Sequence, residues 1–156
     1  MVKKIEGTLD GKGLKVALVQ SRFNDLITGK LAEAAIDGLV RHDVNEKDIS
    51  HIMVPGSFEI PIVAKKAAAS GKYDVVIAIS AIIKGETPHN EYIAAEMTKG
   101  IAHAALKTGV PIVYGTITAD SLEQAIERAG GKGTNRGFQA ALTAIEIANV
   151  IKQVSK

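Results

Sequence analysis

The sequence contains no cysteine and no tryptophan, and it has only three tyrosines, three phenylalanines and four prolines. Without cysteine, the chain forms no disulfide bond, no thiolate metal site and no cysteine nucleophile. The few aromatic residues argue against a platform on which nucleic-acid bases stack. An excess of one charge is also missing, since 19 basic and 17 acidic residues leave a net charge of +2 and no Lys/Arg block occurs. We therefore expect no nucleic-acid partner.

Signatures of metal sites and membranes are missing as well. The histidines, at positions 42, 51, 89 and 103, lack the HExxH pattern and zinc-type spacing, so we expect no metal. The longest apolar runs have the length of strands, far short of a membrane span. The first residues, MVKKIEGTLDGKG, lack the apolar segment of a signal peptide. These absences predict a cytoplasmic protein with no membrane partner.

The pattern that is present predicts an α/β fold. A length of 156 residues fits one domain, spanning residues 1–156. Continuous apolar, β-branched runs, which are typical of strands covered on both faces, occupy residues 15–20, 49–54, 75–79 and 110–114. Helical patterns occupy residues 24–42, 58–70, 89–107, 120–128 and 137–152. This alternation predicts a three-layer α/β/α sandwich with a four-stranded parallel sheet in flavodoxin-like order. We also consider residues 3–8 as an extra edge strand.

Two of these helices have unusually narrow polar faces. Residues 138–151 carry one polar stripe, and residues 93–106 repeat the pattern. Either both helices are buried deeply in one core, or their apolar faces contact other subunits. A chain of this size has limited interior, so we favour contacts between subunits in a homo-oligomer.

In open parallel sheets, ligands bind at the carboxyl ends of the strands. This rule selects the residues after Gln20, Val54, Ile79 and Tyr114. After the first strand, Asn24 is a candidate N-cap. Phe23 then either stacks on a planar ligand or packs beside the cap as a hydrophobic staple.

After the second strand, Pro55 and Gly56 indicate a tight turn. Ser57 is a candidate cap of the next helix. Glu59 lies in its first turn, where a negative charge is favourable, and it could instead accept hydrogen bonds from ligand hydroxyls.

The segment Lys84-Gly85-Glu86-Thr87-Pro88-His89 follows the third strand. Gly85 permits close approach of a ligand, Thr87 can cap a helix, and Pro88 suits the first helical position. A helix N-terminus beside Lys84 predicts an anion site. His89 stands next to it and could transfer protons near neutral pH, although a solvated surface histidine is the alternative.

Two arginines follow the fourth strand, and no GxGxxG or P-loop pattern occurs. Arg128 and Arg136 flank the short, Gly-rich loop 131–135, and both could bind phosphate through paired N–H groups. From the residues alone, cations matched to a helix C-terminus are the preferred explanation.

Ordered across the chain, these motifs resemble those of the 6,7-dimethyl-8-ribityllumazine synthase family. The matching segments are Arg22-Phe23-Asn24, residues 54–61, Lys84 to His89, residues 118–130, Asn135-Arg136-Gly137 and residues 144–149. The resemblance implies condensation of 5-amino-6-ribitylaminouracil with 3,4-dihydroxy-2-butanone 4-phosphate, without a cofactor or metal. It implies pentamers with active sites between neighbours, which in many members close into an icosahedral shell. It also suggests riboflavin synthase as a partner.

The resemblance further implies a role for each site residue. His89 would transfer protons. The pyrimidine and ribityl chain would be bound by Phe23, Gly56, Ser57, Phe58, Glu59, Ala81, Ile82, Ile83 and Tyr114. Gly85, Glu86, Thr87 and Arg128 would bind the phosphate, and Arg136 would contact a neighbouring subunit.

The chain departs from the family pattern at Ser80, Lys84, Asn90, Arg136 and Gln139. These departures motivate an alternative, in which a shell-forming or flavin-binding protein kept the fold and lost catalytic power. A monomeric flavodoxin-like binding module is a third hypothesis.

Overall fold

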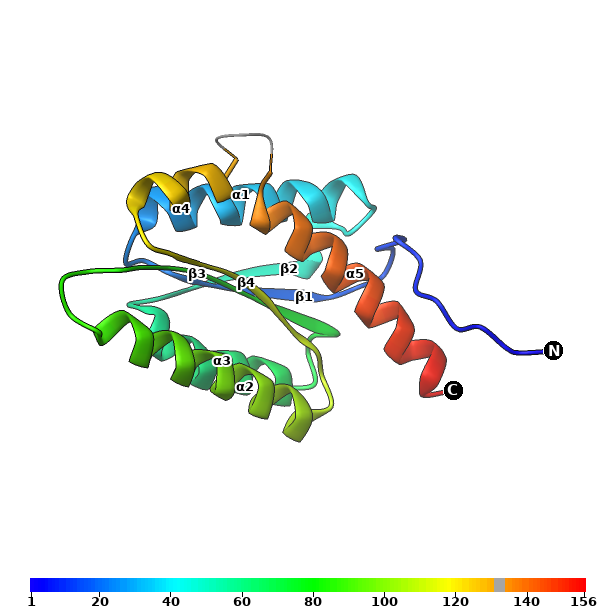
Figure 1. Cartoon of the computed structure of the whole chain (residues 1–156). Helices are drawn as coiled ribbons and strands as arrows, with labels where there is room; N and C mark the ends of the chain where they lie inside the picture. The colour runs from blue at the N-terminus through cyan, green and yellow to red at the C-terminus, as the bar shows by residue number, and fades with distance from the viewer. Residues whose placement is uncertain (131–133) are drawn as a thin grey trace.

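The computed structural model describes residues 1–130 and 134–156, in which a parallel sheet lies between two layers of helices (Figure 1). The elements are β1 (Val16–Ser21), α1 (Asp25–Arg41), η1 (Glu46–Asp48), β2 (Ile49–Val54), η2 (Ser57–Glu59), α2 (Ile60–Ala69), β3 (Val75–Ile83), α3 (His89–Thr108), β4 (Ile112–Ala119), α4 (Leu122–Arg128) and α5 (Arg136–Val154), where η marks a short 3₁₀ helix. The strands are parallel and lie in the order β2-β1-β3-β4. The predicted flavodoxin-like α/β/α sandwich is confirmed.

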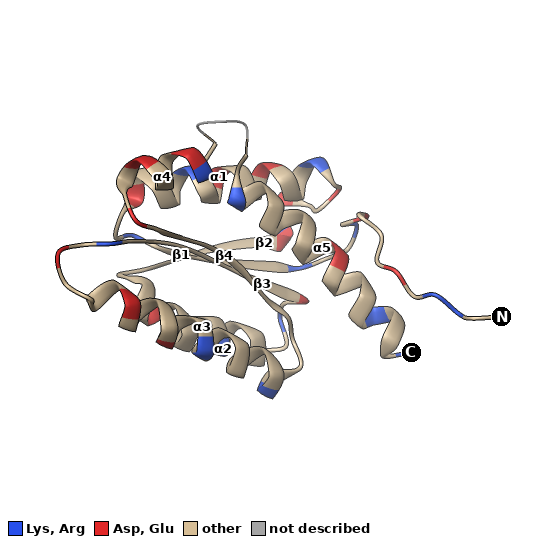
Figure 2. Ribbon diagram, in the orientation of Figure 1, with Lys and Arg blue, Asp and Glu red and all other residues tan. Residues whose placement is uncertain are grey.

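Both faces of the sheet are covered, as the continuous apolar runs predicted. Val16 and Leu18 point into a core shared with α1 and α5, whereas Ala17 and Val19 point into a core shared with α2 and α3. Figure 2 shows the charged residues on the helices and connecting segments, and none lies in the described strands. Burial on both faces therefore explains why the strands are mostly apolar and lack charged residues.

β3 and β4 extend beyond the predicted ranges 75–79 and 110–114. Polar residues interrupt the apolar runs, yet the two strands stay paired from Val76 beside Ile112 to Ile83 beside Ala119. Backbone hydrogen bonds sustain this pairing whatever the side chains are. Tyr114 consequently lies inside β4, and the prediction that Tyr114 marks the carboxyl end of a strand is wrong.

Residues 3–8 do not form an edge strand. Their backbone carbonyls instead bind side-chain amides of α5: Asn149 Nδ2 donates to Thr8 O at 2.9 Å, and Gln153 Nε2 donates to Glu6 O at 2.9 Å. These contacts hold the segment along the helix rather than along the sheet.

The two helices with narrow polar faces differ in their burial. α5 buries small residues, and Gly137 approaches the backbone of Leu31 in α1 so closely that an added Cβ would overlap it. α3 buries only Met97, Ile101 and Ala104 and leaves Leu106 86% exposed. Deep burial within this chain therefore does not explain the apolar pattern of α3, which leaves contact with another subunit as the favoured prediction.

No helix among the described residues is long and apolar enough to span a membrane. Residues 131–133, in the Gly-rich loop between Arg128 and Arg136, lie outside the described residues.

Candidate active site

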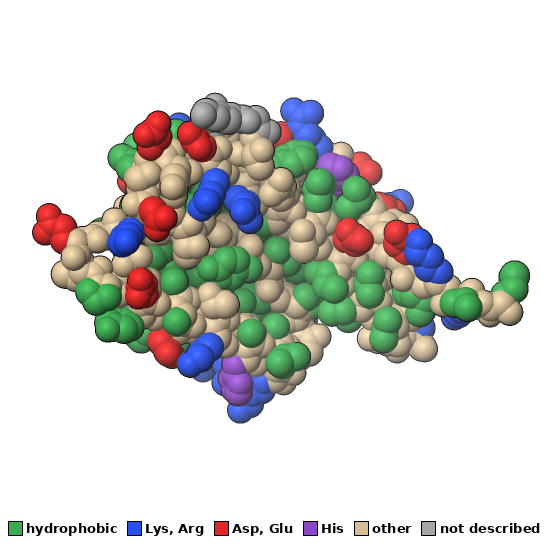
Figure 3. Space-filling view, viewed as in Figure 1, with side chains coloured by type: hydrophobic (Ala, Val, Ile, Leu, Met, Phe, Trp, Pro, Cys, Tyr) green, Lys and Arg blue, Asp and Glu red, His purple; other side chains and the backbone are tan. Residues whose placement is uncertain are grey.

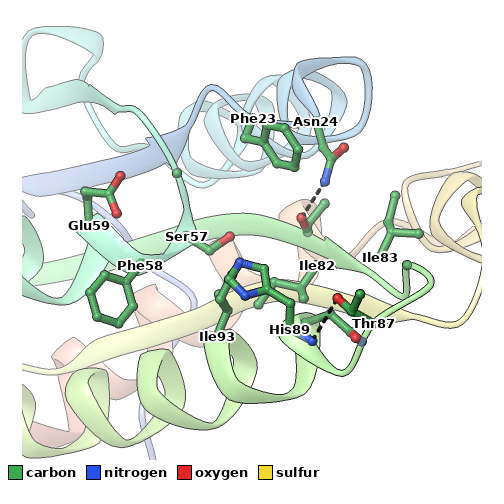
Figure 4. A pocket seen from close by; sticks show the side chains of 14 residues that line it. Phe23, Asn24, Ser57, Phe58, Glu59, Ile82, Ile83, Thr87, His89 and Ile93 are labelled. Atoms are coloured by element: carbon green, nitrogen blue, oxygen red, sulfur yellow. Dashed lines mark hydrogen bonds between the residues drawn. The ribbon is translucent and has the colours of Figure 1, made fainter.

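A pocket of about 390 Å³ opens where β1, β2 and β3 end and α3 begins (Figure 4). It is lined by Phe23, Asn24, Gly56, Ser57, Phe58, Glu59, Ala81, Ile82, Ile83, Gly85, Thr87, His89, Asn90 and Ile93. The predicted site residues between Phe23 and His89 are in this set except Lys84 and Glu86, which are exposed. Three connecting segments and one strand thus supply most of the predicted site.

Phe23 stands at the rim of the pocket. Its backbone N–H donates to Pro55 O at 3.1 Å, which ties the end of β1 to the segment after β2. The residue is 71% exposed. A hydrophobic staple would be packed against its helix, so this exposure favours the alternative, an aromatic ring free to stack on a planar ligand.

Asn24 occupies the N-cap position of α1, as predicted, but its side chain makes no capping hydrogen bond. The backbone is left-handed, with φ 61°, a conformation that Asn tolerates better than most residues. Its Nδ2 reaches across the pocket floor and donates to Ala81 O of β3 at 2.9 Å (Figure 4). This residue therefore connects β1 to β3 beyond the point where those strands stop pairing.

The end of β3 presents free backbone to the pocket. β1 pairs with β3 only as far as Gln20 beside Ile79, whereas β4 remains paired to Ile83. Alternate residues of a strand direct their N–H and C=O groups to the same side. Because Ala81 O binds Asn24 on the β1 side, the backbone groups of Ala81 and Ile83 point toward the pocket. They can recognise the edge of a planar, hydrogen-bonding ring.

The turn after β2 brings two polar side chains to the opposite wall. Ser57 begins η2 and does not cap a helix with its side chain; the predicted cap is wrong. Its hydroxyl instead contacts Ser80 Oγ of β3 in a short hydrogen bond. Glu59 lies close to Gly56, since its Oε1 would be 3.5 Å from a Cβ placed on that glycine, an ordinary van der Waals distance. Figure 4 shows Ser57 and Glu59 on the same segment at the pocket.

The turn 84–88 leads into α3, which begins at His89, so Pro88 precedes the first helical residue rather than occupying it. Pro88 occupies the N-cap position and no side chain caps the helix, so the predicted Thr87 cap is wrong. Thr87 Oγ1 instead accepts a hydrogen bond from His89 N at 3.4 Å. The first N–H groups of a helix have no partner within the helix and attract anions. The imidazole of His89 is exposed and directed into the pocket (Figure 4).

The remaining predicted residues lie elsewhere, on the face formed by β4, α4 and α5. Tyr114 and Arg136 line a second depression of about 430 Å³ together with Gln139 and Thr143. Arg128 Nη1 donates to Thr118 O at 2.6 Å. Figure 3 shows hydrophobic side chains gathered over β4 between α3 and α5, bordered by basic side chains.

The two arginines differ in their relation to the helix dipole. Arg128 lies in the last turn of α4, where a cation stabilises the helix, so helix stability alone accounts for an arginine at this position. Arg136 is the first residue of α5, where a cation opposes the dipole. Local helix stability does not explain Arg136, which makes a ligand-binding or interface role the better interpretation.

Within residues 1–130 and 134–156, no group of three His, Asp or Glu side chains is arranged to hold a metal.

Sequence reasoning missed Ile93 as a lining residue and treated Asn24 only as a cap. Ile93 lies one helical turn after His89 and Asn90, so the spacing i, i+3, i+4 could have identified it.

The model of the 6,7-dimethyl-8-ribityllumazine synthase family matches residues 13–152. The matched region contains all the strands and every residue of the pocket.

Proposed function

The chain belongs to the 6,7-dimethyl-8-ribityllumazine synthase family, and we propose that it condenses 5-amino-6-ribitylaminouracil with 3,4-dihydroxy-2-butanone 4-phosphate. The products are 6,7-dimethyl-8-ribityllumazine, phosphate and water, in the penultimate step of riboflavin biosynthesis. Residues 1–156 act as one domain of a cytoplasmic transferase. The observation that carries this proposal is the free edge of β3 facing His89 across one pocket, in a chain of this family.

The pocket suits the pyrimidine. Backbone groups of Ala81 and Ile83 are directed toward the ring edge, Ile82 lines the floor, and Phe23 stacks on the ring face. Ser57 and Glu59 bind the ribityl hydroxyls, because a hydroxyl and a carboxylate offer the donor and acceptor that a polyol needs. Gly56 and Phe58 complete this wall.

The phosphate-bearing ketone lies at the N-terminus of α3. Gly85, Glu86 and Thr87 contact the phosphate through backbone N–H groups and the Thr87 hydroxyl. Glu86 contributes through its backbone only, because its carboxylate would repel the phosphate.

Most steps of the reaction require a proton transfer. An amine of the pyrimidine attacks the ketone and water leaves to form an imine, and phosphate then leaves by β-elimination. The second amine nitrogen closes the ring on the remaining carbonyl carbon with loss of a second water. His89 transfers protons in these steps, and holding both substrates together supplies further acceleration.

No Lys or Arg is among the residues that line the pocket in the described chain, and Lys84, in the adjoining turn, is exposed and outside the lining. Arg128, Arg136 and Tyr114 lie on the β4–α5 face instead. We infer that a neighbouring copy supplies them, with Arg128 toward the phosphate. The functional unit is then a homo-oligomer, with a pentamer and its icosahedral shell as the expected assemblies.

The test is direct. Purified protein mixed with both substrates should form the lumazine chromophore, measured by its absorbance, and omission of either substrate should abolish the signal. Absence of product at high protein concentration would contradict the proposed reaction.

A further inference from the structure

Three hydroxyl groups form a chain beneath the pocket. Ser21 Oγ is 3.3 Å from Ser80 Oγ, and Ser80 Oγ in turn makes the short hydrogen bond to Ser57 Oγ. Ser21 and Ser80 are both 0% exposed, whereas Ser57 lines the pocket. This row of hydrogen-bonded hydroxyls therefore runs from the core to the ligand cavity.

The fold brings these residues together from three different segments. Ser21 ends β1, Ser57 begins η2 after β2, and Ser80 lies in β3, one residue past the last β1–β3 pair at Gln20 and Ile79. Beyond this point β3 no longer pairs with β1, and its residues line the pocket. A glycine or alanine at position 80 would leave Ser57 without this partner.

Each hydroxyl has a single hydrogen to donate. Ser21 Oγ can donate to Ser80 Oγ or to Phe23 O, and between Ser80 and Ser57 either hydroxyl can be the donor. In both arrangements the contact with Ser80 fixes the position of Ser57 Oγ at the wall of the cavity. Successive hydrogen bonds in a buried row of this kind also polarise one another, which strengthens each of them.

We propose that Ser80 is a positioning residue that holds the Ser57 hydroxyl in place to hydrogen-bond with the polyol chain of the pyrimidine substrate. The assignment of that substrate rests on the proposed function. Ser80 does not line the pocket and acts through Ser57.

The expected effect is on affinity for the polyol. Ser80→Ala removes the oxygen that fixes Ser57 and keeps the Cβ, and Ser21 retains Phe23 O, 3.5 Å away, as an acceptor. Loss of one oriented neutral hydrogen bond should raise the Kd of the ribityl pyrimidine about fivefold. The affinity of 5,6-diaminouracil, which lacks the polyol, should not change.

The experiment measures both affinities by calorimetry for wild type, Ser80→Ala, Ser57→Ala and the double variant. If Ser80 acts through Ser57, the double variant should bind the ribityl pyrimidine no more weakly than Ser57→Ala does. Thr116→Val is the matched control, because Thr116 is paired with Ser80 across β3–β4, is 5% exposed and bonds only toward Ala78 O in the described chain. It should leave both affinities unchanged.

Several outcomes would overturn the proposal: an unchanged Kd in Ser80→Ala, an equal loss for both ligands, or losses that add in the double variant. Calorimetry needs no turnover, so these outcomes are distinct from failure of the proposed reaction. That failure would appear as wild type binding the ribityl pyrimidine without forming the lumazine in the presence of both substrates.

Discussion

The pocket at the ends of β1, β2 and β3 and the face formed by β4, α4 and α5 contrast in what they supply. The pocket offers an aromatic ring, a free strand edge, hydroxyls, a carboxylate and His89, but no Lys or Arg among its described lining residues. The opposite face offers Arg128, Arg136 and Tyr114 beside an apolar surface. One region is shaped for a planar ring that bears a polyol, and the other carries cations. Under the proposed reaction, which uses both, two copies of the chain would form each site.

Removal of His89 tests the pocket and should have the largest effect. His89→Ala should lower turnover by about 10²- to 10³-fold, because a positioned acid–base group contributes on that scale. The assembly should persist, since the side chain is exposed. Lumazine formation and solution mass are the measurements, and His103→Ala, an exposed histidine further along α3, is the control. An unchanged rate would remove His89 from the mechanism.

Removal of Arg128 tests the opposite face. Arg128→Ala should raise KM for the phosphate-bearing substrate about 10- to 100-fold, the scale of a charge-assisted hydrogen bond. Arg41→Ala, whose exposed guanidinium pairs with Asp37, is the control.

The division between two copies can be tested by mixing. Dissociated His89→Ala and Arg128→Ala subunits, reassembled together, should recover activity because some sites combine an intact pocket with an intact Arg128. Activity that stays at the sum of the two variants would show that one chain supplies both groups.

Packing of α5 should affect stability more than chemistry. Gly137→Ala forces a Cβ against the Leu31 backbone and should lower the free energy of unfolding by about 1–3 kcal/mol in urea titrations. Gly29→Ala in α1 is the control, because its Cβ would meet nothing within 4 Å. It should be neutral or stabilising by up to about 1 kcal/mol. Equal destabilisation by both changes would refute close packing as the cause.

The smallest effect is expected at Tyr114. Its hydroxyl accepts a hydrogen bond from Thr98 Oγ1 at 3.4 Å, and the residue is 42% exposed. Tyr114→Phe keeps the ring and should change kcat and KM by less than about twofold, because an exposed, long hydrogen bond contributes little. A larger loss would mean that the hydroxyl contacts substrate.

The sequence by itself determined the order of strands and helices, since continuous apolar runs and helical periodicity reflect burial on both faces of a parallel sheet. It also identified the turn at residues 84–89 and most of the pocket, because strand ends in such a sheet meet at one edge. Tertiary structure alone decided where β3 and β4 end, as backbone pairing continues through Ser80 and Thr116. It likewise turned Asn24 from a cap into a bridge to β3, and it separated Arg136 from the pocket. Such contacts join residues far apart in the chain, and local patterns do not encode them.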